Sequence, residues 1–277
     1  MESARFELPY FDIDIFFSQY WRKRPLYVPQ GAREFLGYQW TIAEFEAAEA
    51  AARRQAGRIK EREGEVTFIE QVSSCDDRLR ESAQVLQVTF GAPQVWFDAI
   101  RTYSGTESPN GIGAHFDHSD NFVLQQSGVK KWTLAAPENI DPETIKRRML
   151  NLPGPGGDHT LPDGDCLAFT VGPGDLLYIP IFWLHSGVSQ GDSLSISLVC
   201  PAVSLYSAVL PLLAKVVRSQ AIGHQPIPAL HSGLNDQQRT DTIEAVAKAT
   251  RTLMGHLTDE ALVRALLGAQ SDYLARL

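Results

Sequence analysis

The fold of this chain is decided by the stretch GAHFDHSDNFVLQ, which occupies residues 113–125. Within it, His115 and Asp117 stand two residues apart and lead into an apolar segment typical of a β-strand. Residues i and i+2 of a strand share one face, so these two side chains can point toward one common atom. A second histidine, His185, ends the largely apolar run that begins at Gly174. The sequence therefore predicts that His115, Asp117 and His185 form a metal site of two imidazoles and one carboxylate.

The other histidines are predicted to lie outside this metal site. His118 directly follows Asp117, so in a regular strand its side chain points to the opposite face, toward solvent or in support of the ligands. Asp120 fails the same alternation test. Four more histidines are expected to be structural or surface residues. His159 lies in a Gly/Pro loop, and three others lie in or beside the C-terminal helices with no carboxylate at metal-ligand spacing: His224, His231 and His256.

Short apolar runs separated by Gly/Pro turns predict an all-β barrel or jelly roll around this stretch. Strands are expected at residues 66–69, 85–90, 122–126, 131–135, 166–171, 176–180 and 193–199. Helices are expected before Pro25, over residues 41–62 and within residues 93–103, and the helix at 41 opens with a Thr41–Glu44 capping box.

The character of the sequence changes at Pro201. Apolar residues recur at helical spacing over residues 203–219, 236–256 and 258–276, which predicts three helices. We therefore expect two parts, residues 1–200 with the strands and residues 201–277 as a helical region. These helices carry no chemical motif, so a homodimer interface and simple packing within the chain stay equally open.

The composition narrows the class of protein. A net charge of −8 argues against non-specific nucleic-acid binding as the main activity. The three cysteines are too few and too dispersed for a disulfide framework, which suits a reducing compartment. No stretch approaches the roughly 20 apolar residues of a membrane helix, and the N-terminus has no basic leader followed by an apolar core. We therefore expect a cytoplasmic protein without a membrane partner.

Several separated motifs, in this order, resemble the JmjC-type Fe(II)/2-oxoglutarate oxygenases. The resemblance is greatest to the cupin-like hydroxylase branch, which includes the ribosomal-protein oxygenases and the asparaginyl hydroxylase factor inhibiting HIF. It covers roughly residues 10–200, and the C-terminal helices are similar in kind to the dimerising helices of these enzymes. The motifs are YWRKRPL at 20–26, HFD at 115–117 with Asn121 and Phe122, GVKKW at 128–132, GDLLYIP at 174–180, and His185.

The resemblance implies a mainly β core with helices, namely a double-stranded β-helix of the jelly-roll or cupin type. N-terminal α/β elements would precede this core and a C-terminal helical bundle would follow it. It also implies that His115, Asp117 and His185 bind Fe(II).

For the co-substrate 2-oxoglutarate, the resemblance matches Lys130 to the residue that pairs with the distal carboxylate, with Lys131 as the alternative if the register differs by one. A cation suits this role because the dianion would otherwise be unpaired in a partly dry cavity. Asn121 matches a polar position near the co-substrate, although a strand-end cap is an equally good interpretation.

Two positions depart from the family pattern. Ile112 stands where the asparaginyl hydroxylase has a threonine that contacts the co-substrate, and the last strand lacks an asparagine found in related enzymes. The side chains expected to contact the co-substrate in place of these two residues are Tyr178, Ser195 or Ser197. Trp183 either packs within the barrel, which we favour, or walls the substrate cleft.

The resemblance implies a dioxygenase that couples oxidation of 2-oxoglutarate by O2, with succinate and CO2 as products, to hydroxylation of an unactivated carbon. An amino-acid side chain of a protein or peptide is the expected substrate. Two alternatives stay open: a free amino acid or natural-product intermediate as substrate, or a cupin-like metal protein that does not use 2-oxoglutarate. A demethylase or a scaffold protein fits less well, because the motifs match the hydroxylase branch and the metal triad is intact.

Overall fold

The structure is a computed structural model of the 277-residue chain. It describes residues 9–55, 57–62, 65–92, 94–103, 113–149, 161–162, 164–201, 210, 213–215, 217–224, 233–260 and 263. Contacts within the chain group it into two compact units, Met1–Ala202 and Val203–Leu277. The assignment of residues 1–200 to an oxygenase domain and of 201–277 to a helical region stays a proposal.

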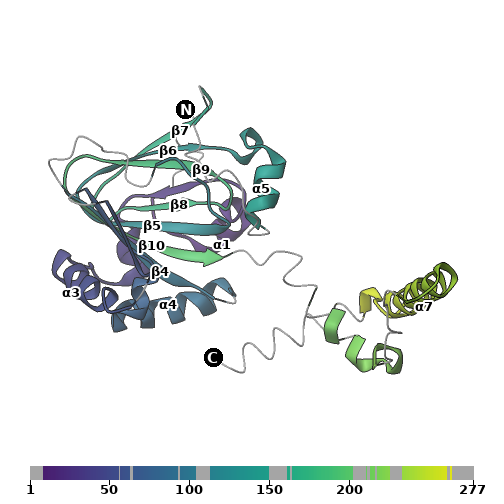
Figure 1. The fold of residues 1–277 in the computed structure, drawn as a ribbon. Helices are drawn as coiled ribbons and strands as arrows, with labels where there is room; N and C mark the ends of the chain where they lie inside the picture. The colour runs from purple at the N-terminus through teal and green to yellow at the C-terminus, as the bar shows by residue number, and fades with distance from the viewer. Residues whose placement is uncertain are drawn as a thin grey trace. The chain divides into compact units, whose positions relative to one another are not determined.

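The first unit is built on a seven-stranded antiparallel sheet with the order β1-β8-β5-β10-β4-β3-β2 (Figure 1). Strands β5 and β10 form its centre, and β10 pairs with both β5 and β4. The strands are β1 (Leu26–Val28), β2 (Ile59–Arg62), β3 (Val66–Ile69), β4 (Trp96–Thr102), β5 (Ser119–Ser127), β8 (Leu176–Ile179) and β10 (Ser193–Pro201).

A second, three-stranded sheet packs against the inner face of the large one. It consists of β7 (Leu167–Val171), β6 (Lys130–Ala135) and β9 (Leu184–Ser189), in that order. Val123 of β5 and Ile179 of β8 contact Trp132 of β6 and its neighbours in a buried apolar cluster between the sheets. Two packed antiparallel sheets of this topology confirm the predicted double-stranded β-helix.

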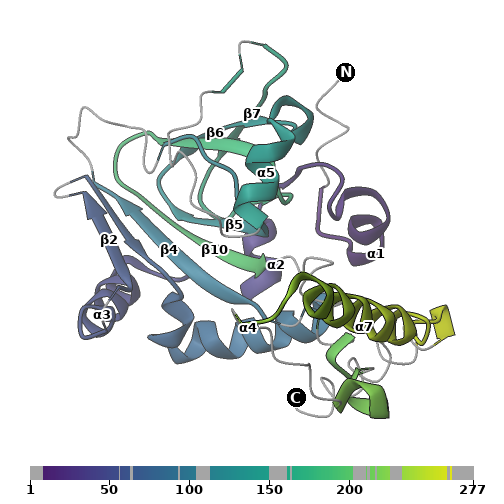
Figure 2. The same ribbon diagram turned by 45° about the vertical axis from the view of Figure 1, so that its right-hand side comes forward.

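The outer face of the large sheet is covered by N-terminal helices. Phe122 and Tyr178 alternate with the inward-facing residues of their strands and pack against aromatic side chains of this segment, such as Phe16. Figures 1 and 2 show α3 and α4 on the side of the large sheet away from β6 and β7. The described helices of the unit are α1 (Ile13–Ile15), a π-helical turn (Phe16–Tyr20), α2 (Gly31–Leu36), α3 (Ile42–Ala52), α4 (Asp77–Phe90) and α5 (Pro142–Met149), together with two short 3-10 helices, Val72–Ser74 and Pro137–Asn139.

Most predicted strands and the Thr41–Glu44 capping box are confirmed, but three segments differ from prediction. Residues 85–90 are the end of helix α4, not a strand, because the buried positions Leu79, Ala83, Leu86 and Phe90 recur at helical spacing. Residues 96–102 form strand β4, not a helix, because this segment completes the hydrogen bonding of both β3 and β10. The helix expected over 41–62 ends at Ala52, and strand β2 follows.

The second unit contains helix α7 (Asp236–Met254), which confirms the middle one of the three predicted C-terminal helices. It begins with a capping box formed by Asn235 and Gln238. The other two predicted helices lie mainly outside the described residues. Among the helices that the structure describes, none is both long enough and apolar enough to span a membrane.

Candidate active site

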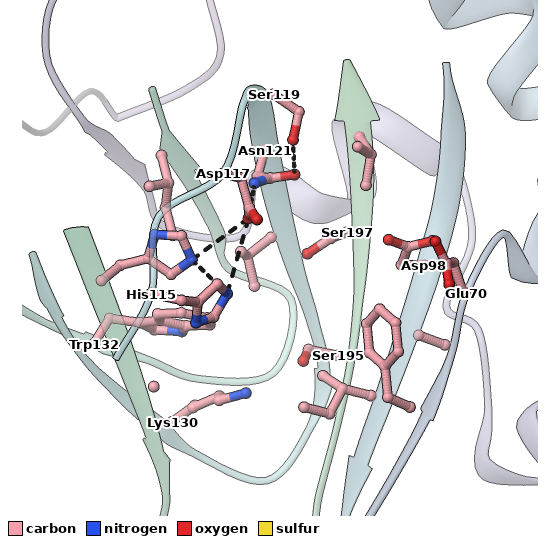
Figure 3. A pocket seen from close by; sticks show the side chains of 18 of the residues that line it. Glu70, Asp98, His115, Asp117, Ser119, Asn121, Lys130, Trp132, Ser195 and Ser197 are labelled. Carbon is pink, nitrogen blue, oxygen red and sulfur yellow. Dashed lines mark hydrogen bonds and ion pairs between the residues drawn. The ribbon is translucent and has the colours of Figure 1, made fainter. Parts of the chain in front are cut away.

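His115, Asp117 and His185 meet at one point of the first unit. His185 lies on β9, and His115 forms an isolated antiparallel bridge with it through backbone hydrogen bonds of 2.8 and 3.0 Å. One ligand atom from each of the three side chains lies within 4.8 Å of the others. The Nε2 atoms of the histidines are 3.2 Å apart, and Oδ2 of Asp117 lies 3.9 and 3.7 Å from them. The backbone bridge thus brings together residues that are distant in the sequence (Figure 3).

The hydrogen bonds around the histidines suit metal binding. Nδ1 of His115 lies 3.0 Å from the carbonyl oxygen of Gly113, and Nδ1 of His185 lies 2.8 Å from that of Trp183. A proton on Nδ1 satisfies these carbonyls and leaves each Nε2 lone pair directed at the centre of the triad. Burial, followed by the neighbouring His115, lowers the pKa of His185 and favours its neutral form. Two neutral imidazoles and one carboxylate are the donor set that a divalent iron site requires.

Asn121 supports the carboxylate of the triad. Its side-chain amide donates a 2.8 Å hydrogen bond to Oδ2 of Asp117 and is itself buried on β5. This contact fixes the orientation of the carboxylate. In the structure, Asn121 therefore positions Asp117 and also lines the cavity described next.

A cavity of about 390 Å³ opens beside the triad, between the two sheets. That volume is typical of a site for a small molecule. Trp132, on β6, and Ser195 and Ser197, on β10, are among its lining residues. Figure 3 shows Lys130 and Ser195 pointing toward each other from opposite walls.

Lys130 is a buried cation at the base of this cavity. Its side chain is 3 % exposed, and Nζ lies 4.7 Å from the centre of the Trp132 ring. Burial lowers the pKa of Lys130 to about 8, and no described carboxylate contributes to this shift. Lys131 is exposed and points out of the cavity, so the register favours Lys130 over Lys131 as the cation that faces a ligand.

A glycine on β9 makes room for this lysine. A Cβ atom at Gly187 would lie 2.6 Å from Cε of Lys130 and 3.0 Å from the ring of Trp132. Gly187 follows His185 by two residues and therefore shares its face of the strand. Gly187 is not among the site residues predicted from the sequence, although glycine within a strand often marks a close approach of neighbouring groups.

Tyr178 does not lie in the cavity. Its ring faces the outer core, and its hydroxyl donates a 2.7 Å hydrogen bond to Asp120 and accepts one of 2.9 Å from the backbone of Arg22. The alternation of β8 places Ile179 toward the cavity and Tyr178 on the opposite face. The structure therefore does not support the expectation that Tyr178 contacts the co-substrate in place of the missing threonine and asparagine. Ser195 and Ser197 do line the cavity and can still take that role.

Asp120 is the centre of a buried network that the sequence analysis did not identify. It is fully buried and accepts hydrogen bonds from Tyr178 and from Nε of Arg22, the latter at 2.9 Å. It also accepts a 3.3 Å hydrogen bond from the backbone of Ile181, in the loop before His185. The basic motif at residues 20–26 is thus joined to the strands that carry the triad.

The other histidines that the structure describes lie outside the metal cluster. His118 contributes no ligand atom to it but does line the cavity, because residues 116–118 are irregular and strict strand alternation does not apply there. His224 and His256 are exposed, as expected. Trp183 packs in the apolar cluster between the sheets. His159, His231 and Ile112 lie outside the described residues.

Asp98 is a second lining residue that the sequence analysis missed. It lies on β4 directly opposite Ser197 of β10, and it accepts a 2.6 Å hydrogen bond from the backbone of Gln71. Burial raises the pKa of Asp98 to about 7, and the charges of Glu70 and Asp117 add to this effect. The incorrect helix prediction for residues 93–103 concealed the fact that its side chain faces inward.

Comparison with known proteins finds similarity to one domain family. The model of the JmjC domain matches residues 81–207. A probable ribosomal oxygenase of Haemophilus influenzae is 25% identical over 214 residues, which are 71% of this chain and 52% of the relative. The bifunctional lysine-specific demethylase and histidyl-hydroxylase NO66 of Drosophila persimilis is 30% identical over 111 residues, or 38% of this chain and 15% of the relative. The chain thus spans about half the length of the first relative and a small part of the second.

A solved structure shows the same fold. YcfD, a ribosomal oxygenase from Escherichia coli in complex with cobalt and 2-oxoglutarate, superposes with a TM-score of 0.54. The match covers 91% of this chain and 68% of YcfD, at 16% sequence identity. The JmjC domain match includes all three residues of the triad and Lys130. On this evidence residues 81–207 match the JmjC domain family, and the chain shares the fold of YcfD.

Proposed function

We propose that this protein is an Fe(II)- and 2-oxoglutarate-dependent dioxygenase that hydroxylates an unactivated carbon of an amino-acid side chain. One observation carries the proposal: the His-Asp-His triad and a buried lysine, which forms no ion pair with any described residue, line the same cavity. The triad offers a site for a divalent metal, and the lysine offers a counter-charge for an anion that reaches across the cavity. 2-Oxoglutarate has a metal-chelating end and a distal carboxylate, so it suits both features.

His115, Asp117 and His185 would hold the iron. Bound Fe(II) supplies the oxidation chemistry in which O2, 2-oxoglutarate and a C–H group become succinate, CO2 and a C–OH group. The chain itself fixes the imidazole tautomers through the carbonyls of Gly113 and Trp183. Three protein ligands leave the other coordination positions of the metal to substrates.

Lys130 would pair with the distal carboxylate of 2-oxoglutarate. Burial of Lys130 without a carboxylate partner is costly in the free protein, and a bound dianion removes that cost. The hydroxyls of Ser195 and Ser197 line the same cavity and would donate hydrogen bonds to the co-substrate. Asn121 would act mainly by holding Asp117, through the amide hydrogen bond described above.

A side chain of a protein or peptide is the proposed substrate. The names of the two relatives, a ribosomal oxygenase and a histidyl-hydroxylase, support this choice. A free amino acid or a natural-product intermediate remains the alternative substrate, and a cupin-like metal protein without 2-oxoglutarate remains the alternative class. We further propose a cytoplasmic setting, since the three cysteines are unpaired, and a homodimer formed through the C-terminal helices.

Turnover of 2-oxoglutarate tests the proposal. We expect succinate to form slowly without added substrate, only when Fe(II) and O2 are both present. Lys130→Ala should raise the KM for 2-oxoglutarate by about tenfold or more through loss of the ion pair, whereas Lys131→Ala should leave it unchanged. An Fe(II)-loaded protein that consumes no 2-oxoglutarate, with or without cell extract, would contradict the proposal.

A mass screen identifies the substrate. Cell extract incubated with the enzyme, Fe(II) and 2-oxoglutarate is compared with extract incubated with the Asp117→Ala variant. The expected product is a peptide that gains the mass of one oxygen atom in the first sample only. A gain found only on free small molecules would favour the alternative substrate class.

A further inference from the structure

One wall of the cavity carries carboxylates that have no role in binding the proposed iron or 2-oxoglutarate. Asp98 and Glu70 lie together on this wall, beyond Ser197 from His115 and Asp117 (Figure 3). Both carboxylates line the cavity. They reach it from β4 and from the end of β3, whereas Lys130 reaches it from the other sheet.

The two carboxylates differ in their partners. Glu70 forms an ion pair of 3.3 Å with Lys60, and both of these side chains are substantially exposed. Asp98 is more enclosed, and no cation among the described residues is a cause of its pKa shift. Asp98 accepts the 2.6 Å hydrogen bond from the Gln71 backbone, and a side-chain interaction with Trp96 also favours its ionised form.

The backbone is arranged to hold Asp98 in this position. Gln71 has a φ of 52°, in the left-handed region that residues other than glycine rarely adopt. This conformation directs its N–H at the Asp98 carboxylate. A strained residue and a desolvated carboxylate are both costly, so the combination is expected where the carboxylate serves a ligand.

The balance of charges in the cavity indicates which kind of substrate would bind beside Asp98. With Fe(II) and 2-oxoglutarate bound, the two positive charges of the metal and the charge of Lys130 offset the dianion and Asp117. The ion pair between Lys60 and Glu70 is neutral by itself. Ionised Asp98 is then left as the uncompensated acidic group among the described lining residues, and a substrate with one positive charge would balance it.

We infer that Asp98 determines substrate specificity by pairing with a positively charged side chain of the substrate, an ammonium or a guanidinium. The inference rests on the proposed function and defines its substrate class. Ser197 lies between Asp98 and the triad, so a side chain held by Asp98 extends along the wall beside the metal ligands.

Binding of small probes tests this inference without relying on turnover. The Zn(II)-loaded protein with 2-oxoglutarate is titrated with Nα-acetyl-arginine amide and with its neutral isostere Nα-acetyl-citrulline amide, and affinity is followed by ligand-observed NMR. A second pair, Nα-acetyl-lysine amide and Nα,Nε-diacetyl-lysine amide, distinguishes an ammonium from a guanidinium. At least one cationic probe should bind about tenfold more tightly than its neutral partner.

Variants assign the preference to Asp98. Asp98→Asn keeps the shape and the hydrogen bond from Gln71, and it should reduce the preference to about threefold or less. Asp98→Glu restores the charge and should recover part of the preference. Glu70→Gln is the matched control, because Glu70 is already paired with Lys60, and it should retain the preference.

The outcomes separate this inference from the proposed function. Equal binding of charged and neutral probes to the wild type would overturn the inference, as would an undiminished preference in Asp98→Asn. Succinate formation reports the proposed function independently. If the protein prefers cationic over neutral probes but consumes no 2-oxoglutarate, the role of Asp98 in binding stands and the proposed oxygenase activity is wrong.

Discussion

Lys130 and Asp98 are charged side chains of opposite sign that face the same cavity from opposite sheets. Burial lowers the pKa of Lys130 to about 8 and raises that of Asp98 to about 7. Each shift means that the folded protein disfavours the charged form, so each residue destabilises the protein without ligands. Residues that cost stability at a cavity are expected to contribute to binding there.

The first prediction concerns Lys130→Met, which keeps the length of the side chain and removes the charge. Because the folded pKa of Lys130 is depressed, the cost of burying its charge is present below about pH 8 and disappears as the pH rises toward 10.5. At neutral pH the variant should therefore be more stable than the wild type without ligands, by about 1–3 kcal/mol. Thermal unfolding with and without 2-oxoglutarate measures this, and 2-oxoglutarate should stabilise the variant less than it stabilises the wild type.

Lys131→Met is the control, since Lys131 is exposed on the same strand. It should change neither the stability nor the response to 2-oxoglutarate. A Lys130→Met protein that is still stabilised by 2-oxoglutarate as strongly as the wild type would show that another group holds the distal carboxylate.

The second prediction concerns Asp98→Asn and the pH dependence of stability. The folded pKa of Asp98 is raised from 3.8 to about 7, so the native state binds more protons than the unfolded state between these values. The contribution of Asp98 to the unfolding free energy therefore falls as the pH rises through that window, and it stays low at higher pH. The gain in unfolding free energy from Asp98→Asn should be larger at pH 8 than at pH 5, by about 1–2 kcal/mol. Denaturant unfolding at the two pH values measures it, and an equal effect at both would show that Asp98 is not desolvated in solution.

At the scale of elements, β9 carries both a metal ligand and the space for Lys130. The third prediction is that Gly187→Ala displaces Lys130, because the new Cβ would lie 2.6 Å from its Cε. The Kd for 2-oxoglutarate should rise by about tenfold, while metal affinity stays near that of the wild type. Calorimetry with each ligand separates the two effects. Ser186→Ala, on the opposite face of β9, is the control, and an unchanged Kd in Gly187→Ala would refute the steric argument.

The Asp120 network connects the N-terminal motif, β5 and β8, and it gives the fourth prediction. Tyr178→Phe removes a donor to Asp120 and an acceptor for the Arg22 backbone N–H. The unfolding free energy should fall by about 1–3 kcal/mol, since buried polar groups are left unsatisfied. The Kd for 2-oxoglutarate should stay unchanged because Tyr178 faces the outer core. A large change in that Kd without a change in the unfolding free energy would show that Tyr178 does contact the co-substrate.

The elements also show what the sequence could and could not predict. Strands with clear alternation next to Gly/Pro turns, such as β8 and β10, were predicted nearly to their ends. Residues 85–90 were mistaken for a strand because β-branched residues occupy the exposed face of α4, with Val85 66 % and Val88 53 % exposed. The triad followed from residue spacing and family motifs, whereas Asp98 and Gly187 did not. Their positions depend on pairing between strands that are distant in the sequence.

At the scale of the whole molecule, the first unit places a metal triad and a buried cation around one cavity between two sheets. The outer face of the large sheet is filled by aromatic packing, which leaves the inner face available for the site. The C-terminal unit contains helix α7, and its proposed role is dimer formation. This role is measured by light scattering of the full chain, for which a monomeric mass would contradict a homodimer.

The central claim is that the cavity holds a divalent metal and 2-oxoglutarate at the same time. Anaerobic calorimetry of 2-oxoglutarate binding, with and without Fe(II), tests this most directly. We predict that Fe(II) tightens the binding of 2-oxoglutarate by about tenfold or more, and that Lys130→Met and His185→Ala each abolish this tight binding. The same weak binding with and without Fe(II), in a protein shown to bind the metal through the triad, would contradict the account.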